Sequence, residues 1–537
     1  MRRWNGWGDD GFSMETPGSG LAYLNDKVPA GDVLADSDLK QVCDAVPASR
    51  LPSHALITTE VEDRVRHARG QSLPDWLAMR SGDFGVFPDG VSYPESTEQV
   101  EEILEFAYNN DIEVIPYGGG TSVCGHINPL QSQRPVLTID MGRMSQLMDL
   151  NKESQIATFG AGVAGPDVEA QLRAHGYTLG HFPQSWELST LGGWVASRSS
   201  GQQSLRYGRI EQMFAGGTMV SPQGRLEIPT IPASAGGPDL REVVMGSEGR
   251  MGIISEVRVR VTPLPDQETF YAVFLPSFEA AKNAVRTIVQ NKIPLSMLRV
   301  SNALETETQL KLAGHEKMIG LLEKYLSLRG VSEGKCLLTF GISGNKKQNK
   351  LSLKQSMNVF KQFGGILGPK MMGEKWAENR FKFPYLRENL WLAGYCVDTF
   401  ETATDWQRVG GLMESMEESV RTALKEEGIV PHVYTHLSHV YTQGCSIYTT
   451  YVFPNADSYG KTLARWEKIK HAASSSVANG HATISHQHGV GKDHAPYLKA
   501  EKGALGMSAI KSLLTFFDPK QTLNPGTLIE NDEQSKS

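Results

Sequence analysis

The sequence has few cysteines, and they are not arranged in a way that would hold a fold together. Five occur among the 537 residues, and no two form a Cys-x-x-Cys pair; they are Cys43, Cys124, Cys336, Cys396 and Cys445. An odd number of scattered cysteines argues against a disulfide framework and against a zinc ribbon. This pattern is typical of a protein in a reducing compartment.

The sequence also lacks a basic excess and long apolar runs. Its formal net charge is −7, so the composition does not favour a nucleic acid as partner. No apolar run reaches the roughly 18 residues that span a bilayer. The first residues include two arginines without an apolar stretch behind them, so we expect no signal peptide, and Ser535-Lys536-Ser537 is not the peroxisomal Ser-Lys-Leu ending. We expect a cytoplasmic protein, with peripheral membrane contact if its substrate is a lipid.

The two common nucleotide-binding motifs are missing, although a glycine-rich loop stands where such motifs occur. Residues 116–122 read Pro-Tyr-Gly-Gly-Gly-Thr-Ser and follow the strand-like Glu113-Val114-Ile115. Ligands tend to bind at the carboxyl ends of strands in α/β sheets, and glycines let backbone N–H groups converge on phosphate oxygens. The loop is neither a Walker A loop nor a Rossmann fingerprint. A glycine triplet by itself more often predicts an ordinary tight turn.

Two further glycine-punctuated segments change that interpretation. Residues 184–194 carry three hydroxyl side chains and the pair Gly192-Gly193, and residues 245–254 form a third such turn before the alternating strand Val257–Val261. Three such segments in one order predict a pocket for a large anionic cofactor. The cofactor-binding candidates are Pro116, Tyr117, Gly118, Gly119, Gly120, Thr121, Ser122, Gln184, Ser185, Trp186, Glu187, Leu188, Ser189, Thr190, Ser197, Arg198, Ser199, Ser200, Glu248, Gly249, Arg250, Met251, Gly252, Ile253 and Ile254.

These segments resemble the PCMH-type FAD-binding domain of the vanillyl-alcohol oxidase superfamily of flavoproteins. Within it, the chain most resembles the alkyldihydroxyacetonephosphate synthase (alkylglycerone-phosphate synthase) family and its bacterial relatives, and the resemblance covers nearly the whole chain. It includes the opening Arg3-Trp4-Asn5-Gly6-Trp7-Gly8 and the box His486-Gln487-His488-Gly489-Val490-Gly491. The resemblance implies FAD as cofactor and an α+β fold: an α/β-type FAD-binding domain plus an α+β cap domain with an antiparallel sheet. The first loop has no histidine for covalent flavin attachment, since His126 lies beyond the glycines, so we expect noncovalent FAD.

A chain of this length exceeds what a single core usually supports. We expect four parts: an N-terminal lead-in (1–90), the FAD-binding domain (91–265), the cap or substrate domain (266–500) and a C-terminal segment that returns to the flavin (501–537). Within the cap, the lysine-rich insert 344–350 predicts a mobile, solvated loop. Ala482–Ile484 predicts a strand before the histidine box.

Polar side chains in the cap domain predict the reacting groups. Period-two alternation along residues 432–439 places His432, Tyr434 and His436 on one face and His439 on the other, with His432 as a structural histidine. The strand 447–453 carries Tyr448, which in isolation would be a packing residue. The imidazoles of His486 and His488 are expected to titrate near neutrality, which suits proton transfer.

The resemblance assigns roles to these residues. It implies that Tyr448, His486 and His488 are catalytic and that Arg387 binds substrate. Arg299 is a weaker second candidate for an anion site, and His436 and Gln487 are further substrate-binding candidates. Arg387 matches the family's substrate-binding arginine, which can grip a carboxylate or phosphate; the alternative for it is a surface ion pair with Glu388. Gln487 stands where the family usually has the middle one of three histidines, so it cannot serve as a base.

The reaction implied by the resemblance is redox-neutral. The acyl group of an acyl-dihydroxyacetone phosphate is exchanged for a fatty alcohol through a flavin N5 adduct, a step of ether-lipid synthesis. The alternatives are an FAD-linked dehydrogenase or oxidase of a 2-hydroxy acid or alcohol, and a flavin-binding protein that has lost catalysis. A metal-assisted dehydrogenase is disfavoured because the strand lacks Gly-Asp-Gly and Gln487 replaces an anionic ligand, so we predict no metal site. The expected partner is a lipid or hydroxy-acid substrate, and a homodimer stays open.

Overall fold

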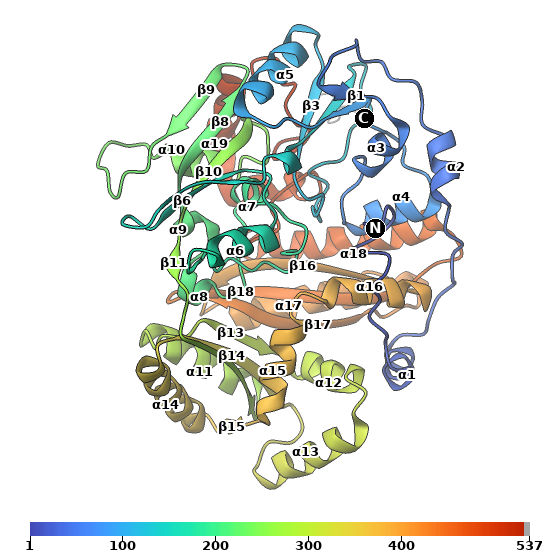
Figure 1. Cartoon of the computed structure of the whole chain (residues 1–537). Coiled ribbons are helices and arrows are strands. Elements are labelled where there is room, and N and C mark those ends of the chain that lie inside the picture. The colour runs from blue at the N-terminus through green and yellow to red at the C-terminus, as the bar shows by residue number, and fades with distance from the viewer. Residues whose placement is uncertain (531–537) are drawn as a thin grey trace.

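The computed structural model describes residues 1–530, so the tripeptide Ser535-Lys536-Ser537 lies outside the described residues. Three larger sheets and the helices around them form the molecule, with the FAD-type segments at one end and the long sheet of the cap at the other (Figure 1). No helix within residues 1–530 is both long enough and apolar enough to cross a membrane.

The first sheet contains the glycine-rich loop at one of its strand ends. Its order is β1 (Ile57–Thr58), β2 (Gly90–Ser92), β4 (Val136–Asp140) and β3 (Glu113–Tyr117), and β2 and β3 both run parallel to β4. Helix α5 (Thr97–Asn109) begins at the N-cap Ser96 and packs Val100, Ile103 and Leu104 on this sheet. The chain returns here at its far end, where the Asn524 N–H donates to the Val114 carbonyl.

The second sheet is antiparallel and completes the FAD-type region. Its order is β5 (Leu147–Asn151), β6 (Ile156–Gly160), β10 (Ile253–Arg260), β8 (Phe214–Ser221) and β9 (Gly224–Ile228). Helices α6 (Gly165–Arg173) and α7 (Leu191–Ser197) contribute Val168, Leu172 and Trp194 to its core. The strand predicted from the alternation at Val257–Val261 is part of β10, whose side chains alternate between buried and half-buried. The short strands β7 (Tyr177–Thr178) and β11 (Thr262–Pro263) pair beside it.

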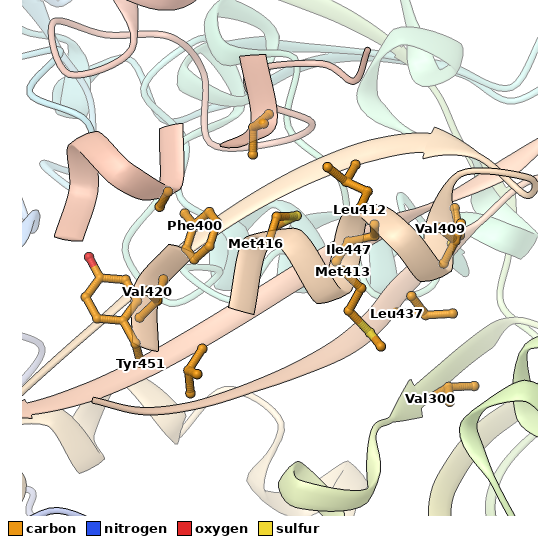
Figure 2. Packing of buried hydrophobic residues seen from close by; sticks show 14 of the residues in the cluster. Val300, Phe400, Val409, Leu412, Met413, Met416, Val420, Leu437, Ile447 and Tyr451 are labelled. Atoms are coloured by element: carbon orange, nitrogen blue, oxygen red, sulfur yellow. The ribbon is translucent and has the colours of Figure 1, made fainter. Parts of the chain in front are cut away.

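The third sheet has seven antiparallel strands and forms the centre of the cap. Its order is β15 (Ile366–Leu367), β12 (Gln267–Leu275), β14 (Cys336–Gly344), β13 (Met297–Ser301), β17 (His432–Val440), β18 (Gly444–Pro454) and β16 (Tyr395–Asp405). Helices α11 (Phe278–Gln290), α14 (Lys346–Gln362), α17 (Val409–Thr422) and α18 (Tyr459–Asn479) lie against it. Figure 2 shows Leu412, Met413 and Met416 of α17 over Leu437 and Ile447 of β17 and β18.

Period-two alternation separates the two faces of this sheet. Leu437 and Ile447 point into the core, whereas His436 and Tyr448, one position away on the same strands, line a cavity. The cavity face is covered by α1 (Gly18–Lys27), α12 (Ala303–Leu312), α15 (Lys370–Asn379) and α16 (Phe383–Leu392). The sheet therefore supports a core on one side and a binding site on the other.

The remaining helices surround these units. They are α2 (Leu39–Asp44), α3 (Val61–Arg66), α4 (Leu73–Ser81), α8 (Ser204–Tyr207), α9 (Ile210–Met213), α10 (Leu240–Val244), α13 (Glu316–Leu328) and α19 (Leu498–Phe517). The lead-in contributes β1 to the first sheet and ends at the first residue of β2, and α4 contacts α18 and β16 of the cap. We keep the division at residues 90, 265 and 500 as a proposal.

Two local predictions are wrong. The insert 344–350 is not a loop: Asn345 caps α14 by accepting a hydrogen bond from the Gln348 N–H, so its lysines lie in the first turns of a helix. Residues 482–484 form no strand. There the Thr483 N–H donates to the Ala403 carbonyl and the Ile484 N–H to the Glu501 carboxylate, so these groups are satisfied without a β-ladder.

Candidate active site

A single cavity of about 510 Å³ joins the three glycine-punctuated segments to the cavity face of the cap sheet. Its lining includes Gly118–Ser122 at one end and Tyr448, His488 and Arg387 further along. The residues predicted to bind the cofactor and those predicted to react therefore belong to one continuous space.

The glycines of the first loop are required by the second segment as well as by a ligand. A Cβ added at Gly119 would overlap the Leu188 carbonyl, and one added at Gly118 would overlap the Thr190 hydroxyl. Gly120 has φ +66°, a conformation that side chains disfavour. Within residues 1–530 the N–H groups of Gly119, Gly120 and Thr121 donate no backbone hydrogen bond. They are free donors at a cavity wall, as a diphosphate would require.

Unpartnered polar atoms continue along the cavity wall. Ser200 Oγ, Gln202 Oε1 and Asn524 Oδ1 line the cavity, are buried, and have no hydrogen-bond partner in the described chain. Buried polar atoms in folded proteins are normally hydrogen-bonded. Together with the open amides, they fit a cofactor that carries both a diphosphate and a ring with polar edges, such as FAD.

The third segment connects this cradle to the histidine box. Glu248, in the left-handed region at φ +51°, accepts hydrogen bonds from the N–H groups of Val490 (2.6 Å) and Gly491 (2.8 Å). Its other contacts are with His126 Nε2, 3.0 Å from its carboxylate, and with Asn524 Nδ2, which donates to its carbonyl at 2.8 Å. One residue thus holds together the loop, the box and the returning tail.

Six predicted cofactor-binding residues do not line the cavity: Trp186, Glu187, Leu188, Arg198, Arg250 and Met251. Trp186 stacks on Phe381, and Glu187 accepts the Tyr385 hydroxyl. Arg198 pairs with two glutamates, and Arg250 donates to the Leu523 carbonyl. Leu188 and Met251 are packing residues. These six side chains support the walls of the cavity. They were candidates because they are close in sequence to residues that line it.

The backbone of the histidine box is held by Glu401 on β16. Its carboxylate accepts hydrogen bonds from the N–H groups of His486, Gln487 and His488 at 2.9–3.1 Å, and from the Ser485 hydroxyl at 2.8 Å. Glu401 is buried. This role could not be predicted from the sequence, because nothing local marks an acid that is 85 residues away from its partner.

Tyr448 and His488 face each other across the cavity wall. The Tyr448 hydroxyl lies 3.5 Å from His488 Nε2 and 3.1 Å from the Thr399 hydroxyl. Burial raises the pKa of Tyr448 to about 12 and lowers the pKa of His488. At neutral pH the phenol is therefore protonated and the imidazole is neutral. The prediction that both box histidines titrate near neutrality is wrong, because burial disfavours the imidazolium.

His486 is turned away from the cavity, unlike its neighbours Gln487 and His488. Its Nε2 lies 2.6 Å from the Tyr441 hydroxyl, and Arg209 donates to its carbonyl at 2.7 Å. Burial lowers its pKa well below the ordinary value. This placement does not fit a reacting group and makes His486 a support of the box.

The two outer histidines of β17 behave differently from each other. His432 contacts the Thr308 hydroxyl at 3.0 Å and stays off the cavity wall, as expected of a structural histidine. His439 was expected on the opposite face from His436, but it lines the same cavity. A register shift between Leu437 and Val440 breaks the alternation and turns Ser438 and His439 toward the cavity together.

Arg387 is a half-buried residue whose guanidinium has free, buried donors. It stacks on Trp76, 4.6 Å from the ring centroid, and one nitrogen donates to the Gln71 carbonyl at 2.7 Å. Its Nε and the other terminal nitrogen are buried without a partner. The alternative of a surface ion pair is wrong, since Glu388 pairs with Arg80 and Arg3 instead. Gln71 and Trp76 were not predicted, because no motif marks them.

Arg299 is already engaged with an acid. It donates to Glu305 at 2.6 Å, and the same carboxylate oxygen lies 3.0 Å from His436 Nδ1. Burial alone would raise the pKa of Glu305, but His436 and Arg299 outweigh it and bring that pKa to about 2. An anionic neighbour makes Arg299 a poorer anion site than Arg387, although both line the cavity.

The far part of the cavity is apolar. It is lined by Leu24, Leu312, Trp376, Phe383, Leu386, Leu390, Val397 and Val452. These side chains come from α1, α12, α15, α16, β16 and β18. Within residues 1–530, no cluster of three or more histidine, cysteine, aspartate or glutamate side chains is arranged to hold a metal ion.

Two known families match the chain. Residues 88–228 match the family described as FAD binding domain, and residues 264–528 match FAD linked oxidases, C-terminal domain. These matches confirm FAD as the cofactor and the α+β fold with its FAD-binding domain.

Individual relatives cover nearly the whole chain. An alkyldihydroxyacetonephosphate synthase from Dictyostelium discoideum is 32% identical, over 87% of this chain and 77% of the relative. One from Trypanosoma brucei brucei is 29% identical, over 99% of this chain and 93% of the relative. A solved alkyldihydroxyacetonephosphate synthase structure superimposes with a TM-score of 0.81 at 26% identity, over 98% of each chain.

Proposed function

Because the chain belongs to the alkyldihydroxyacetonephosphate synthase family of FAD-linked enzymes, we propose that it exchanges the acyl group of acyl-dihydroxyacetone phosphate for a fatty alcohol. The product is an ether lipid precursor. The observation that carries the proposal is the continuous cavity, which runs from a phosphate-type cradle past Arg387, Tyr448 and His488 to an apolar end. This order of polar and apolar walls matches the diphosphate of FAD at the cradle and, beyond it, a substrate with a departing carboxylate and a long acyl chain.

FAD is held without a covalent bond in this proposal. The open amides of Gly119–Thr121 take the diphosphate, and Ser200, Gln202 and Asn524 take polar edges. His126 is engaged by Glu248 and by the Ser122 hydroxyl, which leaves it unsuited to flavin attachment. When bound, FAD supplies an electron-deficient ring that accepts an electron pair from substrate and returns it.

Arg387 holds the carboxylate that leaves. Its two unpartnered N–H groups can bind both oxygens of a carboxylate. The stacking on Trp76 and the bond to Gln71 fix the guanidinium before substrate arrives. A preorganised donor in a site that excludes water contributes about 3–4 kcal/mol to stabilising developing charge.

Tyr448 and His488 move the proton of the reacting carbon. The neutral His488 accepts a proton through Nε2, and the Tyr448 hydroxyl 3.5 Å away donates to the substrate oxygen or relays that proton. Glu401 fixes the backbone that presents His488. Gln487 lines the cavity with an unpartnered Oε1 and binds substrate as a neutral amide.

A helix beside the apolar end provides a membrane contact. Met318, Leu321, Tyr325 and Leu328 form one exposed stripe on α13, and Leu321 and Leu328 are 70% and 87% exposed. Lys317 and Lys324 border the stripe on the helix surface. Its first turn adjoins the cavity wall: His315 contacts Lys375, the neighbour of the lining residue Trp376, and α12, α13 and α15 gather at one end of the molecule (Figure 1). We place the protein in the cytoplasm, in peripheral contact with a lipid surface.

An anaerobic experiment tests the reaction. The purified flavoprotein is mixed with acyl-dihydroxyacetone phosphate, and flavin absorbance is followed without an electron acceptor. We expect bleaching that recovers fully when a fatty alcohol is added, with an alkyl product. Lasting reduction by a 2-hydroxy acid, with no response to the acyl substrate, would instead favour an FAD-linked dehydrogenase.

A further inference from the structure

The cavity wall carries a second carboxylate–imidazole pair, apart from Glu401 and the histidine box. Glu305 of α12 lies 3.0 Å from His436 Nδ1 on β17. The same oxygen of Glu305 accepts hydrogen bonds from Arg299 at 2.6 Å and from Gln309 at 2.9 Å. Glu305 and His436 are both buried, and both line the cavity. The carboxylate is therefore fixed from three sides.

This geometry selects one tautomer of His436. Nδ1 lies 3.0 Å from the Glu305 carboxylate and 3.2 Å from a terminal nitrogen of Arg299. The carboxylate is the nearer group and only accepts hydrogen bonds, so we assign the proton to Nδ1 and the lone pair to Nε2. Nε2 makes no hydrogen bond to any of residues 1–530. Burial and the charge of Arg299 lower the pKa of His436, and they outweigh Glu305, which raises it. The imidazole is therefore neutral. A buried acid that orients an imidazole toward a reaction space is the arrangement of an acid–base dyad.

His436 stands where the polar part of the cavity gives way to the apolar part. Its ring stacks on Tyr448 with centroids 4.9 Å apart, and the two residues are direct partners across β17 and β18. On the same face of β18 follow Thr450 and then Val452. A fatty chain that packs along Val452 and Leu386 can present its terminal hydroxyl at Tyr448 and His436.

The proposed exchange leaves one proton without an acceptor. The bond between the substrate carbon and the acyl oxygen breaks, and its electron pair leaves with the carboxylate held by Arg387. The alcohol oxygen forms the new bond to that carbon, and its hydroxyl proton must be removed. No net oxidation occurs. His488, whose ring meets the Tyr448 ring edge-on, serves the carbon-bound proton.

We propose that His436 Nε2 is the base that accepts the hydroxyl proton of the incoming fatty alcohol, and that Glu305 is its positioning residue. The inference rests on the proposed exchange reaction. It divides the proton transfers between two imidazoles that both contact Tyr448, His488 for the substrate carbon and His436 for the alcohol.

Two rates measured on each variant test this division. The first is incorporation of labelled fatty acid into acyl-dihydroxyacetone phosphate, which needs no alcohol; the second is formation of the alkyl product. For His436→Gln we expect the ratio of the second rate to the first to fall by roughly 100-fold or more. The ratio does not depend on the fraction of folded protein. A ratio within about threefold of wild type would overturn the proposal.

Variants of Glu305 distinguish a positioning role of this carboxylate from a packing role. Glu305→Gln is expected to lower kcat for the alkyl product more than it raises KM for the alcohol, and Glu305→Asp to recover part of the loss. The charged and titratable groups facing His436 are Glu305, Arg299, Tyr448 and His439. Loss of the Glu305 charge should move the rising limb of the alkylation rate to lower pH. An unchanged limb would contradict the dyad, whereas a wild-type protein that catalyses neither reaction would refute the proposed function instead.

Discussion

Replacing Glu401 with glutamine tests whether the histidine box is positioned by that carboxylate. Oε1 of Glu401 accepts from three backbone N–H groups and one hydroxyl, and Oε2 accepts from the His486 N–H as well. Hydrogen bonds to a charged acceptor contribute roughly 1 kcal/mol more than those to a neutral one. The amide keeps one oxygen and turns its NH₂ toward the His486 N–H, where Oε2 had accepted at 2.9 Å. We expect the box to be destabilised by about 2–3 kcal/mol relative to its opened state.

Amide hydrogen exchange measures this loss locally. A change of about 2–3 kcal/mol corresponds to roughly 30- to 150-fold faster exchange in the peptide that contains residues 485–491. The matched control is Glu501→Gln, because Glu501 accepts from Ile484 and Thr483 just before the box but at its exposed side. Faster exchange in the control alone, or equal exchange in both variants, would show that the box is held by something other than Glu401. Alkylation should slow in Glu401→Gln while FAD stays bound.

Three further predictions follow from the same structure. Arg387→Gln should retain FAD but lower kcat/KM for acyl-dihydroxyacetone phosphate by roughly 100-fold or more. Steady-state kinetics on protein with an intact flavin spectrum measures this, and an unchanged kcat/KM would show that Arg387 does not bind the anion. Burial lowers the pKa values of His181 and His439 to about 3. Both are therefore protonated more readily in the unfolded chain, so the stability that they contribute should be complete above pH 6.5 and fall as the pH drops toward 3. Urea unfolding between pH 7 and 5 should show a shallower loss of stability in His439→Gln, and an identical slope would contradict a buried, neutral His439. The double variant Leu321→Glu, Leu328→Glu should bind anionic phospholipid vesicles more weakly than wild type in a sedimentation assay. The control Leu505→Glu, at an equally exposed leucine on α19, should bind as wild type does. Equal binding by wild type, double variant and control would refute the α13 contact.

The sequence predicted that the glycine-punctuated segments meet at one cavity, because the signals of these segments are local. Three glycine-punctuated turns carry their own backbone requirements, and Gly118–Gly120 do meet the segment around Leu188 and Thr190. The alternation that placed His436 and Tyr448 on one face is equally local, since period two follows from the strand itself. The family resemblance then connected these segments to Arg387 and the histidine box.

The sequence failed where the answer depends on distant partners. His486 and His488 look equivalent in the sequence, but Tyr441 and Arg209 hold the first away from the cavity. His439 reaches the cavity only because of a bulge that no residue type announces. Glu401 and Trp76 act on groups that are remote in sequence, so no motif could include them. The helix at Lys346 was readable, since an asparagine cap precedes it with Gln348 three residues later.

The contact of the returning tail with the first sheet has a consequence for the order of events during synthesis. Asn524 and Leu523 lie beside Val114, and Asn524 also contributes to the cavity wall. A ribosome makes the glycine loop first and this last piece of the wall only after the whole cap. The cofactor cradle of the nascent chain therefore stays incomplete until translation is almost finished. We expect FAD to be taken up after synthesis, and a chain that stalls within α19 to be released as an apoprotein.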